Sequence, residues 1–227
     1  TMAATAPILR FSLICQPGSR VGRKLVGDKI LVPEEIFKTM LNKFGREPMP
    51  DPMIFELRNA KKRRISHCGV LEFTSPEPNV GILPDWMFKN LKLKPGQRLV
   101  FTLRPIKKLR YVLLQPIKTE FGDVRRPELQ LTRALEKFTC LTVGDEVPVP
   151  IEGKTHTFRI RKILPARSDK NLPGVGCIVD TDIKVDFMEA VEAKRSNDAN
   201  ARNKRQPAAA AGASSAPPPP PPLSRAP

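Results

Sequence analysis

The sequence predicts a β-rich, α+β protein with a strand-rich lobe followed by a small lobe that mixes strands with a helix. Short apolar runs with strand alternation recur through residues 8–115, separated by turns rich in proline and glycine. Residues 116–190 change character and combine an amphipathic segment with a hairpin. A chain of 227 residues is long enough to build both cores.

The first lobe is predicted to contain two helices among its strands. A helix begins after Pro33, because apolar side chains from Ile36 to Phe44 recur at helical spacing and Glu34 stands in the first turn, where a negative charge is favoured. A second, short helix is expected at residues 84–91. The strands are expected at residues 8–14, 29–32, 53–57, 65–73, 80–83, 98–103 and 109–114.

The second lobe is predicted from one helix and a hairpin. Residues 127–138 place Leu131, Leu135 and Phe138 on one helical face. The remaining elements are a strand at residues 146–151, a turn at 152–154, a returning strand at 155–164 and a last strand at 176–180.

Both ends of the chain are predicted to be disordered. Residues 1–7 form a short lead, and residues 191–227 form a tail of polar, alanine-rich and proline-rich sequence that cannot bury enough surface to fold. The proline run at residues 217–222 is expected to act as a spacer, with a ligand for a small recognition domain as the alternative.

The net charge of +16 indicates an acidic partner. The tail from residue 191 carries six basic and two acidic residues, which leaves +12 on the part expected to fold. Nucleic acid, an anionic membrane surface and an acidic protein all satisfy such a charge. No run of 18 apolar residues indicates a membrane span. The opening Thr1-Met2 suggests that an upstream segment was removed.

The candidate catalytic residues do not assemble into a site, so we expect no enzyme and no cofactor. His67 and Cys68 are neighbours on one predicted strand and therefore point to opposite faces. His156 lies on the predicted hairpin and is expected to face solvent. The pair Asp180 and Asp182 lacks the glycine-containing loop and the second copy of an aspartic protease, and no phosphate-binding glycine motif occurs.

The four cysteines are expected to be buried thiols in a reducing compartment. Cys15, Cys68, Cys140 and Cys177 lie far apart in apolar runs, and no paired spacing of cysteine or histidine predicts a metal site.

Nucleic-acid binding is the alternative function that the charge supports. Basic clusters occur at residues 20–29, 58–64, 104–110 and 159–170. Single-strand binders interleave such clusters with exposed aromatic rings, and only Tyr111 offers one.

Two segments resemble a known family. Residues 67–73 (His-Cys-Gly-Val-Leu-Glu-Phe) and residues 83–91 (Leu-Pro-Asp-Trp-Met-Phe-Lys-Asn-Leu) are similar to the amino-terminal domain of ubiquitin fusion degradation protein 1. The resemblance extends in register over residues 8–187, with further matches at residues 27–33, 52–57, 135–145 and 182–187.

The resemblance implies a double-psi β-barrel lobe at residues 8–115 and a small α/β lobe at residues 116–190. It also implies a non-catalytic adaptor that binds ubiquitin or polyubiquitin chains. With a nuclear-protein-localisation partner, such an adaptor delivers ubiquitylated proteins to the AAA segregase ATPase (valosin-containing protein), for extraction in ER-associated degradation and proteasomal destruction, or for organelle import.

Two features depart from the family pattern. Family members carry their ATPase-binding and partner-binding segments downstream of this domain, whereas no Phe or Trp follows Phe187 and Gly212 is the last glycine. Basic insertions such as residues 61–64 and 104–110 suggest a diverged copy. We expect it in the cytoplasm or nucleus, or alternatively in an organelle such as a secondary plastid if a targeting segment was removed upstream.

The candidate ubiquitin-binding residues are Trp86, Met87 and Phe88, an apolar cluster on the short helix. The alternative role for this helix is to plug one end of the barrel. Because ubiquitin's apolar patch has a basic rim, the positive charge predicts weak binding, or binding of a more acidic ubiquitin-like modifier.

Overall fold

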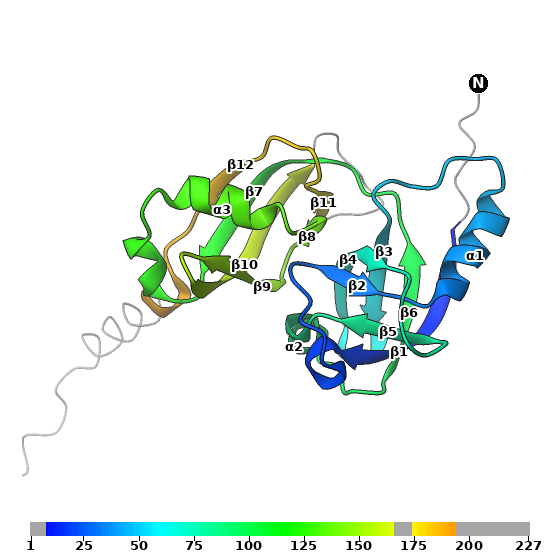
Figure 1. Cartoon of the computed structure of the whole chain (residues 1–227). Helices are drawn as coiled ribbons and strands as arrows, with labels where there is room; N and C mark the ends of the chain where they lie inside the picture. Colours follow the sequence, from blue (N-terminus) through cyan, green and yellow to red (C-terminus); the bar gives the residue numbers. More distant parts are fainter. Residues whose placement is uncertain (1–7, 166–173, 194–227) are drawn as a thin grey trace, which may run out of the picture.

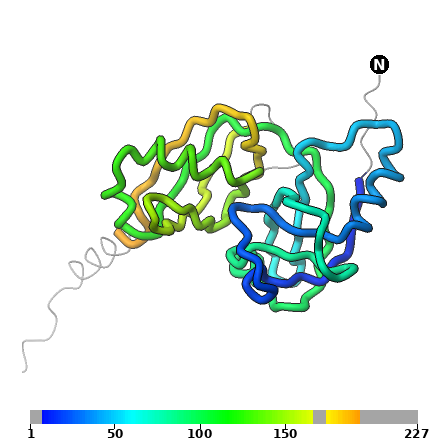
Figure 2. The backbone as a smooth tube through the Cα atoms, in the orientation of Figure 1, coloured from blue at the N-terminus to red at the C-terminus, as the bar shows by residue number. Residues whose placement is uncertain are grey.

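The computed structural model describes residues 8–165 and 174–193, which form two lobes (Figures 1 and 2). The first lobe is a closed barrel in the order β1-β5-β2-β4-β3-β6, where β1 also pairs with β6. The pairs β1–β5 and β2–β4 are parallel and the other pairs are antiparallel. The strands are β1 (Arg10–Pro17), β2 (Lys29–Leu31), β3 (Ile54–Asn59), β4 (Arg64–Glu72), β5 (Val80–Leu83) and β6 (Arg98–Leu103).

Alternation along the strands fills the barrel. On β6, Leu99, Phe101 and Leu103 point inward and are almost fully buried. Helix α1 (Glu34–Phe44) and helix α2 (Asp85–Leu91) lie on opposite sides of the barrel and complete its core (Figure 1). The structure thus confirms the predicted fold class, with both helices of this lobe where the sequence places them.

The second lobe is built on a four-stranded sheet in the order β12-β7-β10-β9, with a two-stranded ribbon of β11 and β8. Its core includes Leu131, Leu135 and Phe138, as predicted. Helix α3 ends at Leu135, three residues earlier than expected, and Phe138 follows in a turn closed by its N–H on the Leu135 carbonyl at 2.8 Å. The elements are β7 (Leu109–Pro116), α3 (Pro127–Leu135), β8 (Cys140–Thr142), β9 (Glu146–Ile151), β10 (Lys154–Pro165), β11 (Val175–Cys177) and β12 (Lys184–Phe187).

The boundary between the lobes differs from the prediction. Residues 109–114 were assigned to the first lobe, but β7 pairs with β10 and β12 in the second sheet. The boundary therefore falls between Leu103 and Leu109, and the value near Gln115 was wrong. Alternation identifies a strand, but it does not identify the neighbour with which the strand pairs.

The predicted disordered lead (residues 1–7) and most of the predicted tail (residues 194–227) lie outside the described residues. Residues 191–193 were placed in the tail but adopt a helical turn on the second lobe. The Glu192 N–H donates to the Ile117 carbonyl at 3.1 Å, which ties this turn to the sheet.

The two lobes differ in whether their sheets have free edge strands. The barrel closes on itself and has no free edge. In the second lobe β9 carries Pro148 and Pro150 and, within the part of the chain that the structure describes, pairs with β10 alone. Proline lacks a backbone N–H, so these residues reduce the capacity of β9 to pair with a further strand.

Candidate functional site

Helix α2 carries the three residues predicted to bind ubiquitin, and two of them lie in the interior of the barrel. Met87 is 0% exposed and Phe88 is 8% exposed, both within the barrel core. Trp86 is half-buried and packs against the cores of both lobes. Contact of these residues with ubiquitin stays a prediction, but burial confines direct contact to Trp86. Their packing matches the alternative role of a helix that plugs the barrel.

Trp86 joins the two lobes directly. Its indole Nε1 donates to the Gly27 carbonyl at 2.8 Å, and its ring centroid lies 6.4 Å from that of Phe138 in the second lobe. A tryptophan packed against a core needs a partner for its N–H, and Trp86 has one on the loop that precedes β2.

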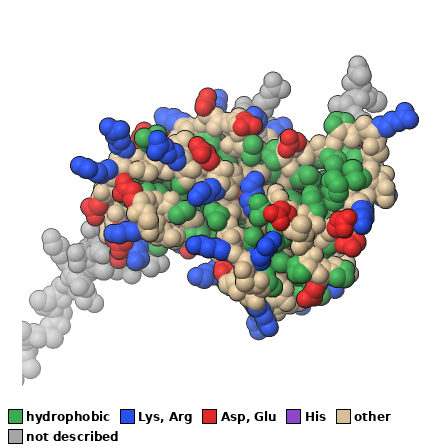
Figure 3. All heavy atoms as spheres, viewed as in Figure 1, with side chains coloured by type: hydrophobic (Ala, Val, Ile, Leu, Met, Phe, Trp, Pro, Cys, Tyr) green, Lys and Arg blue, Asp and Glu red, His purple; other side chains and the backbone are tan. Residues whose placement is uncertain are grey.

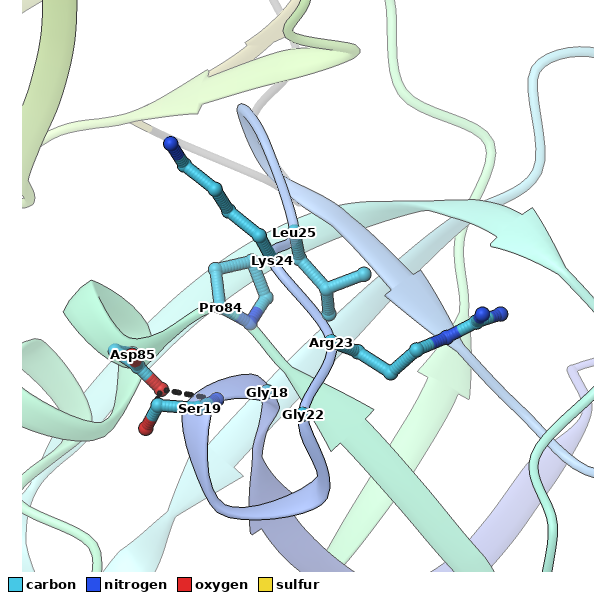
Figure 4. Close-up of a pocket in the computed structure, with 8 residues that line it drawn as sticks. All are labelled: Gly18, Ser19, Gly22, Arg23, Lys24, Leu25, Pro84 and Asp85. Carbon is cyan, nitrogen blue, oxygen red and sulfur yellow. Dashed lines mark hydrogen bonds between the residues drawn. The ribbon is translucent and has the colours of Figure 1, made fainter.

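A hydrogen-bonded loop holds the start of α2 in place (Figure 4). Asp85 Oδ1 accepts from the Ser19 backbone N–H at 3.2 Å and from the Ser19 hydroxyl at 2.9 Å. The loop and the helix enclose a hollow of about 250 Å³. Arg23 and Lys24 line it but extend away from Asp85 (Figure 4). Because Asp85 Oδ1 is engaged by Ser19 and the basic side chains extend away from it, we assign this hollow a structural role.

The junction between the lobes is organised around the carboxylate of Asp28, which is 0% exposed. Its Oδ1 accepts from the Thr139 N–H at 2.7 Å, and its Oδ2 accepts from the Cys140 N–H at 2.9 Å and from the Cys140 thiol at 3.3 Å. Burial raises the pKa of Asp28, and the two backbone hydrogen bonds oppose that shift. One side chain of the barrel thus satisfies two buried amides of the other lobe.

Two glycines let the backbones of the lobes approach. A Cβ on Gly27, whose φ is +67°, would collide with the Lys137 carbonyl oxygen. A Cβ on Gly69, in β4, would collide with the Thr139 side chain. The lobes are therefore in van der Waals contact along the segment from Lys137 to Cys140.

His67 and Cys68 point to different surroundings, as predicted for neighbours on a strand. The His67 Nδ1 lies 3.0 Å from the Thr142 hydroxyl of the second lobe, and burial lowers the pKa of His67 to about 4. The Cys68 thiol donates to the Phe55 carbonyl at 3.7 Å, and burial raises its pKa. A neutral histidine and a protonated thiol on opposite faces cannot act as a base and its nucleophile.

A third contact of the junction lies beside His67. The Ser66 hydroxyl donates to Asp145 Oδ2 at 2.6 Å. Burial raises the pKa of Asp145 to about 7, against the lowering effects of Ser66 and of the nearby Arg64 charge. The carboxyl group is held by a single side-chain donor in a largely dehydrated place, which favours its protonated form.

The remaining candidate residues are also separate from one another. All four cysteines are free and buried, as expected. His156 is half-buried, with its ring 5.7 Å from that of Phe121, so its expected solvent-facing position was wrong. Asp180 and Asp182 lie in an exposed loop. Within residues 8–165 and 174–193 no group of three or more His, Cys, Asp or Glu is arranged to hold a metal, and no helix is long and apolar enough to cross a membrane.

A partly exposed apolar stripe runs along α1, in which Leu41 is exposed and Phe37 is half-buried. Phe37 and Leu41 occupy successive turns of one helical face, and Leu41 is 45% exposed. The ring of Phe37 lies 4.9 Å from that of Phe73, which follows β4. Glu34 begins the same stripe and is paired with Lys38 at 3.1 Å. Figure 3 shows hydrophobic side chains gathered on the side of the barrel that carries α1, with acidic side chains along one border. We call Phe37, Leu41 and Phe73 the α1 patch.

Comparison with known families identifies both lobes. Residues 12–106 match the family model described as ubiquitin fusion degradation protein UFD1, N-terminal subdomain 1, and residues 108–190 match N-terminal subdomain 2. The chain belongs to the ubiquitin fusion degradation protein 1 family. The limit between the two matches falls in the link between β6 and β7, in agreement with the sheet pairing.

Curated relatives in this family are about one third identical. The ubiquitin fusion degradation protein 1 homolog of Caenorhabditis elegans is 34% identical over 169 residues, 74% of this chain and 46% of the relative. The ubiquitin recognition factor in ER-associated degradation protein 1 of Homo sapiens is 33% identical over 161 residues, 71% of this chain and 48% of the relative. The chain spans about half the length of the curated relatives it matches.

Sequence reasoning missed two features of these surfaces. Asp28 was noted only as part of a family match, because nothing in a sequence shows that a carboxylate will face amides more than 100 residues away. The α1 patch was read as helix core. The sequence does contain an indication of this patch, because Phe37 and Leu41 make the apolar face of the helix wider than the stripe of Ile36, Met40 and Phe44.

Proposed function

We propose that this member of the family is a non-catalytic adaptor that binds ubiquitin or polyubiquitin chains and presents ubiquitylated proteins to an AAA segregase ATPase. The match of both lobes to the family's amino-terminal subdomains carries this proposal. The names of these relatives refer to ubiquitin recognition in ER-associated degradation and to ubiquitin fusion degradation, and neither name describes an enzyme.

The α1 patch supports ubiquitin recognition physically. Ubiquitin presents a flat apolar patch with a basic rim, so a binder needs exposed apolar side chains with carboxylates nearby. Leu41 supplies an exposed apolar group, the half-buried rings of Phe37 and Phe73 extend it, and Glu34 supplies a carboxylate at the start of the same stripe. The ion pair between Glu34 and Lys38 is exposed and therefore weak enough to exchange partners.

Titration of ¹⁵N-labelled ubiquitin with the full chain tests the proposal. We expect saturable shifts on ubiquitin's apolar patch, with affinity that is weak for single ubiquitin and higher for tetraubiquitin through avidity. If no saturable shift appears at millimolar concentration with either probe, ubiquitin recognition by this chain is wrong.

A matched pair of variants locates the contact. Leu41→Glu and Leu129→Glu each place a carboxylate on an exposed helical position, with wild-type exposures of 45% and 44%. We expect Leu41→Glu to weaken ubiquitin binding about tenfold, as loss of an apolar anchor does, and Leu129→Glu to leave it within about twofold. If the two variants changed ubiquitin affinity equally, the ubiquitin contact would lie away from α1, and the proposed ubiquitin binding itself would still stand.

Delivery to the ATPase is tested separately by co-precipitation of the full chain with the ATPase, with and without ubiquitylated client. Recovery that depends on this chain supports the adaptor role. Ubiquitin binding without any ATPase recovery would limit the chain to recognition.

A further inference from the structure

The outer surface of the barrel across the neighbouring strands β1, β6, β3 and β4 is strongly basic. The outward positions of these strands alternate with core positions, so Arg98, Val100 and Thr102 face away from the interior filled by their neighbours on β6. We define the basic barrel face by its four arginines, its two exposed aliphatic residues and one carboxylate. These residues are Arg10, Arg58, Arg98, Arg104, Val100, Ile65 and Glu56.

Strand register arranges most of the face in two adjacent rows, and Arg98, opposite Ile14 of β1, lies one row further along. One row crosses the strands from Arg10 through Thr102 and Glu56 to His67. The next row crosses from Ser12 through Val100 and Arg58 to Ile65. Residues directly opposite in neighbouring strands are within side-chain contact range, so each row is a continuous line of side chains.

Arginines outnumber acidic groups on this face. Arg58 binds Glu56 Oε1 at 3.2 Å, and the Nε of Arg104 lies 3.4 Å from Glu56 Oε2. Within the described residues Arg10 and Arg98 have no carboxylate partner, and Arg98 Nη1 donates to the Ser12 carbonyl at 3.0 Å. Together with Val100 and Thr102, Arg10, Arg58 and Arg104 line a hollow of about 260 Å³ above Glu56. Both oxygens of the one carboxylate are engaged, so the excess positive charge faces outward.

The apolar groups of the face are aliphatic. Val100 is 45% exposed and Ile65 is 39% exposed, and Arg58 lies between them in the second row. None of the large hydrophobic side chains that are exposed within residues 8–165 and 174–193 is aromatic. Single-stranded nucleic acid is held by stacking of its bases on aromatic rings, which this face lacks. A partner that combines carboxylates with aliphatic side chains fits it better.

We propose that the basic barrel face binds an acidic, extended polypeptide segment with an aliphatic side chain that covers Val100. Arg98 and Thr102, which lies opposite Arg10, are four residues apart on β6, about 13 Å at the usual rise per residue, so an extended segment of about five residues reaches from Arg98 past Val100 to Arg10. Carboxylates of the segment pair with Arg10 and Arg98 and increase the rate of encounter. The closed barrel offers no edge for strand addition, so recognition depends on side chains.

This site is distinct from the one proposed for ubiquitin. The basic rim of ubiquitin would be repelled by four guanidinium groups, whereas the α1 patch has a carboxylate beside it. The two sites therefore call for opposite charges in their partners, and one can fail without the other.

Fluorescence anisotropy with the full chain tests the proposal. The probe is a labelled ten-residue peptide of Asp and Glu with two central leucines, compared with the same peptide bearing serines in place of the leucines, and with a labelled oligothymidine of ten nucleotides. We expect the leucine peptide to bind at least about fivefold more tightly than the serine peptide, because only the former covers Val100. Equal affinity of the two peptides would overturn the proposal.

Variants assign the binding to this face. The double variant Arg10→Glu, Arg98→Glu is expected to weaken binding of the leucine peptide about tenfold, since two attractions between charges become repulsions. The matched control is Lys154→Glu, Lys162→Glu, two exposed positions on β10, and it is expected to change affinity less than about threefold. Val100→Ser, a small change at an exposed position, is expected to abolish the preference for leucine over serine.

Unchanged thermal unfolding of each variant shows that the barrel is intact, and any variant that melts early is replaced by Arg98→Gln alone. If oligothymidine bound more tightly than either peptide, and the Arg10→Glu, Arg98→Glu variant lost that binding, the face would be assigned to nucleic acid and the peptide proposal would be overturned. If the control variant weakened peptide binding equally, the effect would come from net charge alone, and the peptide proposal would be overturned as well.

Discussion

Asp28 in the barrel accepts a hydrogen bond from the backbone N–H of Thr139 at 2.7 Å, across a sequence separation of 111 residues. The same carboxylate accepts from Cys140, so two amides at the start of the second lobe depend on one side chain of the first. Polar contacts of a few barrel side chains therefore help to hold the two lobes together.

Replacing Asp28 with alanine should destabilise the whole domain. The change leaves two buried N–H groups without an acceptor, at about 1–3 kcal/mol each. We expect the free energy of unfolding in urea to fall by about 2–5 kcal/mol. Asp123→Ala, at an exposed position, is the control and should cost less than about 0.5 kcal/mol. An unchanged urea midpoint for Asp28→Ala would show that the two amides find other acceptors.

Gly27 should be more sensitive to substitution than Gly22. Both have left-handed φ values, +67° and +68°, so an alanine at either position is strained by about 1–2 kcal/mol. Only at Gly27 does the added methyl collide with a backbone oxygen of the other lobe. We expect Gly27→Ala to cost at least about 2 kcal/mol more than Gly22→Ala in thermal or urea unfolding. Equal costs would mean that the segment at Lys137 moves freely.

Trp86→Phe separates a structural role from ubiquitin contact. Phenylalanine keeps most of the ring but removes the N–H that reaches the Gly27 carbonyl, so stability should fall by about 1–2 kcal/mol. If the role of Trp86 is to join the lobes, ubiquitin affinity should stay within about twofold. The reverse result, weaker ubiquitin binding with unchanged unfolding, would place Trp86 in the ubiquitin contact.

Asp145 should make the domain less stable as the pH rises. Burial raises the pKa of its carboxyl from 3.8 to about 7, so within that interval the folded state keeps a proton that the unfolded chain has released. The free energy of unfolding therefore falls between about pH 4 and pH 7 through this group. His67 acts in the opposite direction, because its pKa is lowered to about 4 and its contribution is lost as the pH falls from about 6.5.

Comparison with Asp145→Asn isolates the carboxyl group, since asparagine keeps an acceptor for the Ser66 hydroxyl and leaves His67 in place. We expect the stability of this variant relative to the natural chain to increase from pH 5 to pH 8, measured by urea unfolding at each pH. A difference that is constant across that interval would contradict the raised pKa.

Local elements were predictable from the sequence, whereas partners were not. The spacing of Ile36, Met40 and Phe44 predicts α1 because a helical period depends only on neighbours along the chain. The strand at Leu109 was found but assigned to the wrong lobe, since pairing with β10 and β12 depends on residues far away. The opposed faces of His67 and Cys68 followed from strand geometry alone.

The surfaces were harder to predict for the same reason. Burial of Met87 depends on how α2 seats against the barrel, which no local pattern encodes. Likewise, Arg10, Arg58 and Arg98 come from three strands and form one basic surface only through their register.

Closure of the barrel has a consequence for how this domain can change over time. A partner meets side chains only, because every barrel strand already has two neighbours and no backbone edge is open to it. Substitutions on the outer face can therefore alter which molecule is recognised without disturbing the hydrogen-bonded framework beneath. A copy of this domain that acquires basic residues on its exterior can gain a new partner and keep its ancestral architecture.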